Sequence, residues 1–205
     1  MDRSANPPRW GENVLRLVLG PDEAETVFGD LLEQYRETIS NTHRRWESER
    51  WLARQVAGFV WRALWIWPAM LALFLSGRSA FDTFAPPADG NFGPRAALTT
   101  YALAALFVVV GAWAARRTGR ASSGVVAVLI THLMGSLINI AYELAFFAAL
   151  IQPDPERMRQ SQLAGGADEL WLLPLMMVPA VMILGATGGF VGKFFRASRQ
   201  RPALI

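Results

Sequence analysis

The chain has 205 residues, of which 52% are hydrophobic, with a formal net charge of +3 and no cysteine. Long apolar runs separated by short charged segments are typical of a membrane protein. The lack of cysteine excludes disulfides, thiolate metal sites and cysteine nucleophiles. The arginines lie beside the apolar runs and form no recognition motif for DNA or RNA. We therefore attribute the basic charge to membrane topology and anionic headgroups, and expect no nucleic-acid partner.

The first part of the chain predicts a small helical module. Residues 7–19 place apolar side chains at helical spacing between a Pro-Pro start and the Gly20-Pro21 stop. A second helix follows, with acidic residues in its first turn and an apolar face that should pack on the first helix. Residues 43–55 predict a basic, tryptophan-bearing helix that runs straight into the membrane. We assign residues 1–55 to this module and its juxtamembrane helix.

The rest of the chain predicts a bundle of membrane-spanning helices. Four apolar runs reach about the 20 residues that a spanning helix needs. They cover residues 56–76, 97–115, 124–151 and 170–192, and are followed by a basic tail at residues 193–205. Arginine is in excess in the segment before the first run, in the connection between the second and third runs, and in the tail. By the positive-inside rule, both termini then face the cytoplasm. The predicted fold class is an all-α integral membrane protein, with an N-terminal cytoplasmic helical module followed by a four-helix bundle.

Several motifs in the first sixty residues occur in a characteristic order. They are Pro8-Arg9-Trp10, the helix from Leu15 to Leu19, Pro21 with its acidic follow-on, Gly29-Asp30-Leu31 with Glu33 and Tyr35, and the Arg54-Gln55 pair. This series resembles the permease prefix domain, a helical module ahead of the membrane part of bacterial macrolide-efflux and lipoprotein-release type ABC permeases, including the duplicated orphan permeases of Acidobacteria. The resemblance covers about residues 7–60. It implies a location in the bacterial inner membrane. A two-helix unit this small should lean on the juxtamembrane helix, the bilayer or a partner, so we expect it to serve in docking or regulation. The alternative is that it only helps insertion and folding.

The chain departs from that family in two ways. Such permeases carry a large extracytoplasmic domain between spans, and the outer connections here are too short to hold one. The segment GATGGFVGKFF ends like a phosphate-binding loop, but Thr187 stands where the loop needs glycine and Phe194 where it needs serine or threonine. We expect neither a whole permease nor an ATPase. The expected partners are the lipid bilayer and a membrane protein (permease or ATPase) or a second copy of the chain.

The third apolar run carries a polar stripe. His132, Ser136, Asn139 and Glu143 are spaced four, three and four residues apart, which puts them on one helix face. A charged side chain facing lipid at mid-depth costs about 3 kcal/mol, so this face should turn toward the bundle. We expect Glu143 to pair with an outer arginine or with Tyr101. Two interpretations stay open: a polar path or ligand pocket in which His132 and Glu143 exchange protons, or interhelical hydrogen bonds that fix the packing.

The fourth apolar run contains overlapping pairs of small residues four apart. They are Gly185, Gly188, Gly189 and Gly192, and they predict close helix packing.

Catalytic chemistry has little basis in the sequence. There is no nucleophile set, no His-Glu-x-x-His pattern and only one intramembrane histidine, so we expect no catalytic residues, metal or cofactor. The leading hypothesis is a non-catalytic, transporter-associated or regulatory membrane component. The alternative is a small autonomous carrier or channel that uses the polar stripe. A membrane-embedded enzyme ranks third, because His132 and Glu143 lie about three turns apart on one helix.

Overall fold

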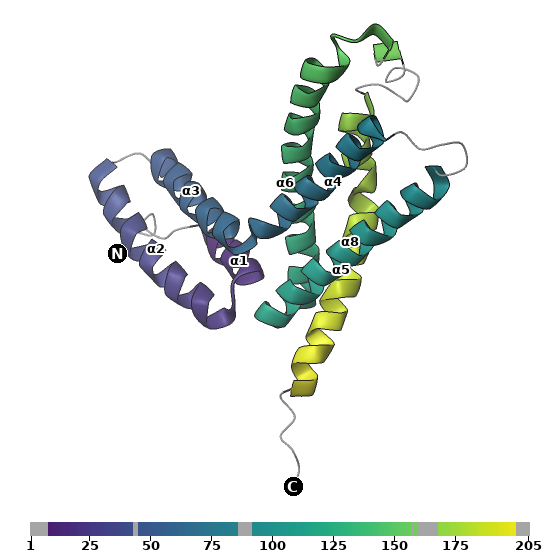
Figure 1. The fold of residues 1–205 in the computed structure, drawn as a ribbon. Coiled ribbons are helices and arrows are strands. Elements are labelled where there is room, and N and C mark those ends of the chain that lie inside the picture. Colours follow the sequence, from purple (N-terminus) through teal and green to yellow (C-terminus); the bar gives the residue numbers. More distant parts are fainter. Residues whose placement is uncertain (1–7, 43–44, 86–91, 157, 160–167, 200–205) are drawn as a thin grey trace.

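The computed structural model describes residues 8–42, 45–85, 92–156, 158–159 and 168–199. These parts are helical and contain no strand, which confirms the expected all-helical class. Figure 1 shows their arrangement. The helices are α1 (Arg9–Val18), α2 (Pro21–Thr42), α3 (Arg45–Leu64), α4 (Ile66–Phe84), α5 (Phe92–Thr118), α6 (Ala121–Phe146), the π-helical turn η2 (Phe147–Ile151) and α8 (Asp168–Arg199).

The first three helices form an N-terminal module. α1, α2 and α3 pack on one another, and Leu15, Tyr35 and Leu52 are buried among them. At Gly11 of α1, an added Cβ would lie only 3.6 Å from the side chains of Leu52 and Val56, so α1 and α3 approach closely there. The two predicted helices therefore use the third helix as their main support, because two short helices cannot bury enough apolar surface by themselves.

The juxtamembrane helix continues without a break into the predicted first apolar run, but that run is not one straight helix. α3 and α4 are separated at Trp65 by a bend of 63°. Pro68 has no N–H group, so it cannot donate to the carbonyl oxygen of Leu64, although Trp65 N–H still bonds to Trp61 O at 2.8 Å. The loss of one bond in the helical ladder accounts for the kink. The apolar run at residues 56–76 is thus a bent pair of helices, not one straight span.

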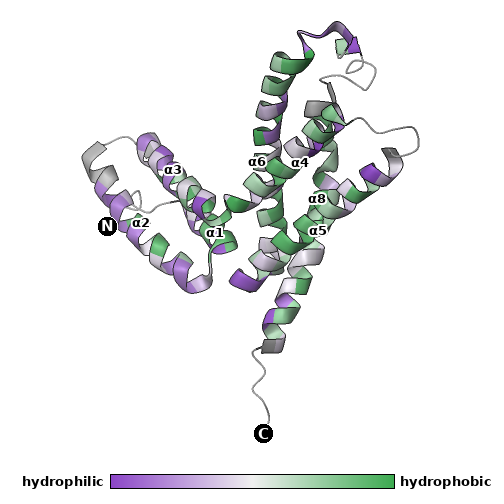
Figure 2. Ribbon diagram, in the orientation of Figure 1, coloured by the Kyte–Doolittle hydropathy of each residue, from purple (hydrophilic) through white to green (hydrophobic). Residues whose placement is uncertain are grey.

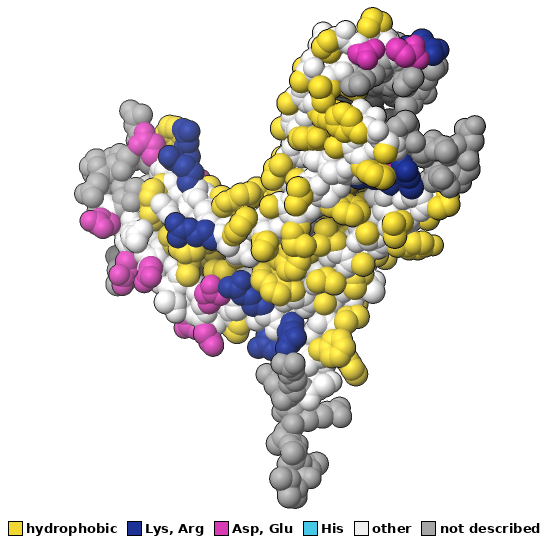
Figure 3. All heavy atoms as spheres, in the orientation of Figure 1, with side chains coloured by type: hydrophobic (Ala, Val, Ile, Leu, Met, Phe, Trp, Pro, Cys, Tyr) yellow, Lys and Arg dark blue, Asp and Glu magenta, His cyan; other side chains and the backbone are white. Residues whose placement is uncertain are grey.

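The membrane half is built around α5, α6 and α8, which pack on each other, while α4 packs mainly on α6. Three helical segments are long and apolar enough to cross a bilayer: Gly93–Thr118, Ala121–Ile151 and Leu172–Ser198. The bent pair Trp46–Leu64 and Ile66–Phe84 makes a fourth if it counts as one span. Apolar residues line these helices and cover the visible face of the bundle (Figures 2 and 3). Such an exposed apolar belt is the surface that lipid would cover.

Two helices extend seven or eight residues beyond their predicted C-terminal limits. α4 continues to Phe84, so residues 77–84, expected in a connection, are helical. α8 continues to Arg199, so most of the predicted tail is helical as well. In both cases the helix continues through polar residues. The hydropathy pattern marks only the apolar part of a helix, so it predicts an end that comes too early.

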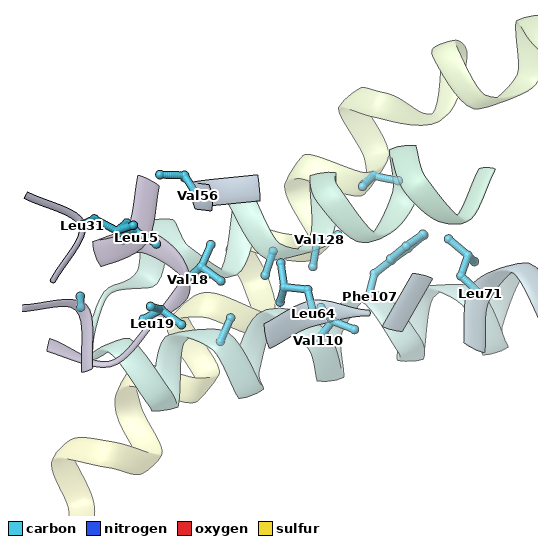
Figure 4. Packing of buried hydrophobic residues seen from close by; sticks show 14 of the residues in the cluster. Leu15, Val18, Leu19, Leu31, Val56, Leu64, Leu71, Phe107, Val110 and Val128 are labelled. Atoms are coloured by element: carbon cyan, nitrogen blue, oxygen red, sulfur yellow. The ribbon is translucent and has the colours of Figure 1, made fainter. Parts of the chain in front are cut away.

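A tight turn connects α5 to α6 and anchors two other elements. Gly119 adopts φ of 78°, the left-handed conformation that ends many helices. Arg196 of α8 donates from Nη1 to the carbonyl oxygen of Arg117 at 3.2 Å, which brings a cation to the negative end of the α5 dipole. Apolar residues of α1 also pack beside this turn, so the buried cluster is continuous from the module into the bundle (Figure 4).

Candidate functional site

The polar stripe of α6 faces three neighbouring helices, and its Asn139 and Glu143 meet α4. The Ser76 hydroxyl of α4 donates to Asn139 Oδ1 at 2.9 Å. One turn further along, the Ser79 hydroxyl donates to Glu143 Oε2 at 2.9 Å. The three-residue spacing of the serines on α4 matches the four-residue spacing of their acceptors on α6, so the two helices are joined by a short ladder of side-chain bonds.

The other half of the stripe consists of His132 and Ser136, and its histidine faces α8 and α5. His132 is 6% exposed, and its Nε2 lies 2.8 Å from the carbonyl oxygen of Pro174 in α8. A carbonyl only accepts hydrogen bonds, so Nε2 carries the proton in this contact. The imidazole also meets the ring of Phe107 in α5 edge to face, with centroids 5.9 Å apart. Ser136 is 5% exposed. The structure thus turns all four stripe residues toward the bundle.

The predicted partners of Glu143 are wrong. Tyr101 is 73% exposed on α5. Glu143 accepts a hydrogen bond from Ser79 instead. The outer arginines Arg78 and Arg95 bond to other groups, described below. The physical reason is the extension of α4, since the helical path beyond residue 76 carries Ser76 and Ser79 along α6. The signal was present in the sequence as two serines three residues apart, but it became readable only once that segment was known to be helical.

A second polar cluster lies where α4 and α5 approach the connection between them. Arg78 Nε pairs with Asp82 Oδ2 at 2.5 Å, and Arg78 Nη1 donates to the carbonyl oxygen of Arg95 at 2.9 Å and to the hydroxyl of Thr99. Arg95 Nη1 lies 3.5 Å from Asp82 Oδ1 and donates to the carbonyl oxygen of Ala85 at 2.7 Å. The 3.5 Å approach is an ion pair without hydrogen-bond geometry. We call Arg78, Asp82, Arg95 and Thr99 the arginine cluster.

Glycines mark the crossing of α5, α6 and α8. All four predicted packing glycines lie against the backbone of α5 or α6: Gly185, Gly188, Gly189 and Gly192. A Cβ on Gly188 would overlap the carbonyl oxygen of Val108, and one on Gly192 that of Ala112. The sequence reasoning missed Gly111 and Gly124, which supply the matching small surfaces on α5 and α6. They could have been found by asking which partner helices offer glycines of their own.

The residues of the prefix-type motif divide into two groups. Leu31 and Tyr35 are buried in the core of the module. Trp10, Pro21, Gly29 and Asp30 are exposed, and nothing lies within 4 Å of a Cβ built on Gly29. The second group therefore lies on the surface of the module and not in its core.

An ion pair attaches this module to the bundle. Arg117, at the end of α5, donates from Nη2 to Glu23 Oε2 of α2 at 2.6 Å, and its guanidinium lies 5.6 Å from the ring of Trp113. The carbonyl oxygen of the same arginine is 3.7 Å from a Cβ built on Gly20, so backbone contacts reinforce the pair. The module is therefore seated on the α5–α6 turn.

Chemically, the polar groups of this structure are suited to holding helices together. Within the residues described, no three His, Asp or Glu side chains come close enough to bind a metal ion. Comparisons with family models, curated proteins and solved structures gave no match. The resemblance to the permease prefix domain stays a prediction that rests on the motifs alone.

Proposed function

We propose that this chain is a non-catalytic, multi-pass protein of the bacterial inner membrane whose N-terminal module docks a partner in a transporter-type assembly. The module and both termini lie in the cytoplasm in this proposal. The transporter context is supported by the motif resemblance, and the docking role by the outer surface of α2.

The orientation is supported by the charge at one end of the bundle. Basic residues gather at the α5–α6 turn and the nearby end of α8, where Arg116, Arg117, Arg120, Lys193 and Arg196 lie. By the positive-inside rule, this end is cytoplasmic. The module is seated on the same end, so it belongs on the same side.

The observation that carries the docking role is the acidic face of α2. This helix has six carboxylates and one arginine, a formal charge of −5. Asp22, Glu25, Asp30, Glu33 and Glu37 are all exposed along it. Anionic headgroups repel such a face, so it suits a protein partner with a basic surface better than the bilayer. Its opposite side is fixed by Leu31 and Tyr35 in the core, so the face is held on a rigid support.

The stripe of α6 supports this proposal over a carrier or channel. Its histidine, asparagine and glutamate each have a hydrogen-bond partner on another helix. Groups held in this way stabilise the bundle and fix its register.

The test is affinity capture of the full-length protein from native membranes after chemical cross-linking. The variant Asp30→Lys with Glu33→Lys reverses the centre of the acidic face. The matched control is Asp154→Lys with Glu156→Lys, which makes the same charge change beyond η2, at the other end of the bundle. We expect a permease or ATPase to be captured with the wild type and the control, and lost with the α2 variant. Capture of neither class, or equal capture by both variants, would contradict the proposal.

A further inference from the structure

An open groove runs along the bundle between α4 and α5. These two helices are neighbours in the sequence, yet they touch little, because α4 packs on α6 while α5 packs on α8 and α6. Two adjoining hollows of about 430 Å³ each lie between them. They share Leu73, Phe74 and Ala102, so they form one continuous groove. Each hollow is within the range of about 300–1,000 Å³ that is common for small-molecule sites.

The groove is apolar along its length and basic at one end. Its walls include Met70, Leu98 and Leu106, and its end is formed by Phe81 with Arg78 and Arg95 of the arginine cluster. The wall residues Met70 to Phe81 span eleven helical steps, or about 16 Å at 1.5 Å per residue. One leaflet of a bilayer core is about 15 Å thick, half of about 30 Å. The groove therefore has the length of a single leaflet.

The arginine cluster has charge left over for a ligand. Its two guanidiniums face one carboxylate, that of Asp82, which leaves a formal charge of +1. Arg78 uses Nε and Nη1 for its bonds, and Arg95 uses Nη1. The Nη2 group of each arginine makes no hydrogen bond to any residue within the described parts of the chain. A guanidinium has five N–H donors in a planar fork that fits phosphate oxygens.

We propose that the groove binds one anionic phospholipid of the leaflet at the α4–α5 end. An acyl chain lies along Leu73, Phe74 and Ala102, and the phosphate of the headgroup accepts hydrogen bonds from Arg78 and Arg95. Charge selects the headgroup and the length of the groove selects an acyl chain. Both properties distinguish this site from the rest of the apolar belt, which contacts lipid without selecting it.

The test is native mass spectrometry of the full-length protein in detergent with added dioleoylphosphatidylglycerol or dioleoylphosphatidylcholine. We expect one phosphatidylglycerol to be retained in preference to phosphatidylcholine. Arg95→Gln should lower this retention about tenfold or more, because a charge-assisted bond is lost. Arg62→Gln is the matched control: it removes the same charge from the exposed end of α3, and should retain lipid like the wild type.

A second pair of variants tests the apolar part of the groove. Ala102→Trp fills it, whereas Ala105→Trp adds the same bulk to an exposed position on α5 outside it. Loss of retained phosphatidylglycerol with the first variant alone supports the site. Equal retention of the two lipids, or equal retention by Arg95→Gln and Arg62→Gln, would overturn it. A dimer that Ala102→Trp dissociates without any change in lipid retention would assign the groove to a second copy and would also overturn it.

Discussion

Replacing Gly124 by alanine should loosen the crossing of the three central helices. Gly124 lies on α6 where this helix meets both α8 and α5. A Cβ there would lie 2.7 Å from the carbonyl oxygen of Gly185, 2.8 Å from Cα of Gly189 and 2.9 Å from the carbonyl oxygen of Gly111. Real Cβ atoms are essentially never closer than 3.0 Å to such a neighbour, and ordinary van der Waals contact begins at 3.4 Å, so the nearest atom must move by at least 0.3 Å and by 0.7 Å to reach ordinary contact. All three neighbours are backbone atoms, so whole helices have to shift.

The magnitude follows from two opposing effects. Overpacking of this kind costs about 1–3 kcal/mol. Alanine in place of glycine in a helix returns about 0.5–1 kcal/mol. We expect a net loss of about 1–2 kcal/mol in the free energy of unfolding, because no rotation of a flexible side chain can relieve backbone contacts.

The assay is reversible unfolding of the purified protein in mixed micelles, followed by far-UV circular dichroism. Gly58→Ala is the matched control, since nothing lies within 4 Å of a Cβ built on Gly58 of α3. It should leave stability unchanged or raise it by up to about 1 kcal/mol. If Gly124→Ala proved as stable as Gly58→Ala, the close approach of α6 to α8 and α5 would be refuted.

Three further predictions concern the stripe, the module and the turn. Glu143→Gln keeps an acceptor for the Ser79 hydroxyl, so its free energy of unfolding should stay within about 0.5 kcal/mol of the wild-type value. Glu143→Leu removes the acceptor and should lose about 0.5–1.5 kcal/mol in the same unfolding assay. Proton flux into vesicles that depends on Glu143 would instead favour a carrier. Glu23→Arg should increase hydrogen exchange in α1, and adding Arg117→Glu should restore protection. The coupling energy between the two positions should be about 0.2–1 kcal/mol and should fall with added salt, because both side chains are partly exposed. Equal exchange in the single and double variants would show that the ion pair does not hold the module. Gly119→Ala should lower the free energy of unfolding by about 1–2 kcal/mol, because alanine is strained at φ of 78° and its Cβ would lie 2.8 Å from Arg196 Nη1. An unchanged free energy of unfolding would show that the turn tolerates another conformation.

Helical periodicity was enough to predict the parts of the fold that depend on one helix at a time. The spacing of His132, Asn139 and Glu143 predicted their common face, and the four-residue spacing of Gly185 and Gly189 predicted a close crossing. Each of these properties is encoded within a single turn or two of helix. The membrane-spanning segments were likewise visible as long apolar runs.

The sequence pattern could not predict features that depend on two helices at once. Ser79 could not be identified as the partner of Glu143, because the pairing requires α4 to extend beyond residue 76 and also depends on how α4 is rotated against α6. The bend at Trp65 was missed because Pro68 lies within an unbroken apolar run, where hydropathy carries no sign of a lost hydrogen bond. The groove between α4 and α5 exists because α4 packs on α6 while α5 packs mainly on α8. The spacing of residues within one helix does not predict which other helix it will contact.

The seating of the module on the α5–α6 turn has a consequence for how the chain is made. Arg117 follows Glu23 by 94 positions, so at about 5–20 residues per second the ribosome needs about 5–19 s to supply it. During that interval Val18 and Leu19, which are buried beside the turn in the finished protein (Figure 4), have no cover from it. The module is synthesised first and completed late, and a chain that stalls before its third apolar run displays an apolar patch to chaperones and proteases.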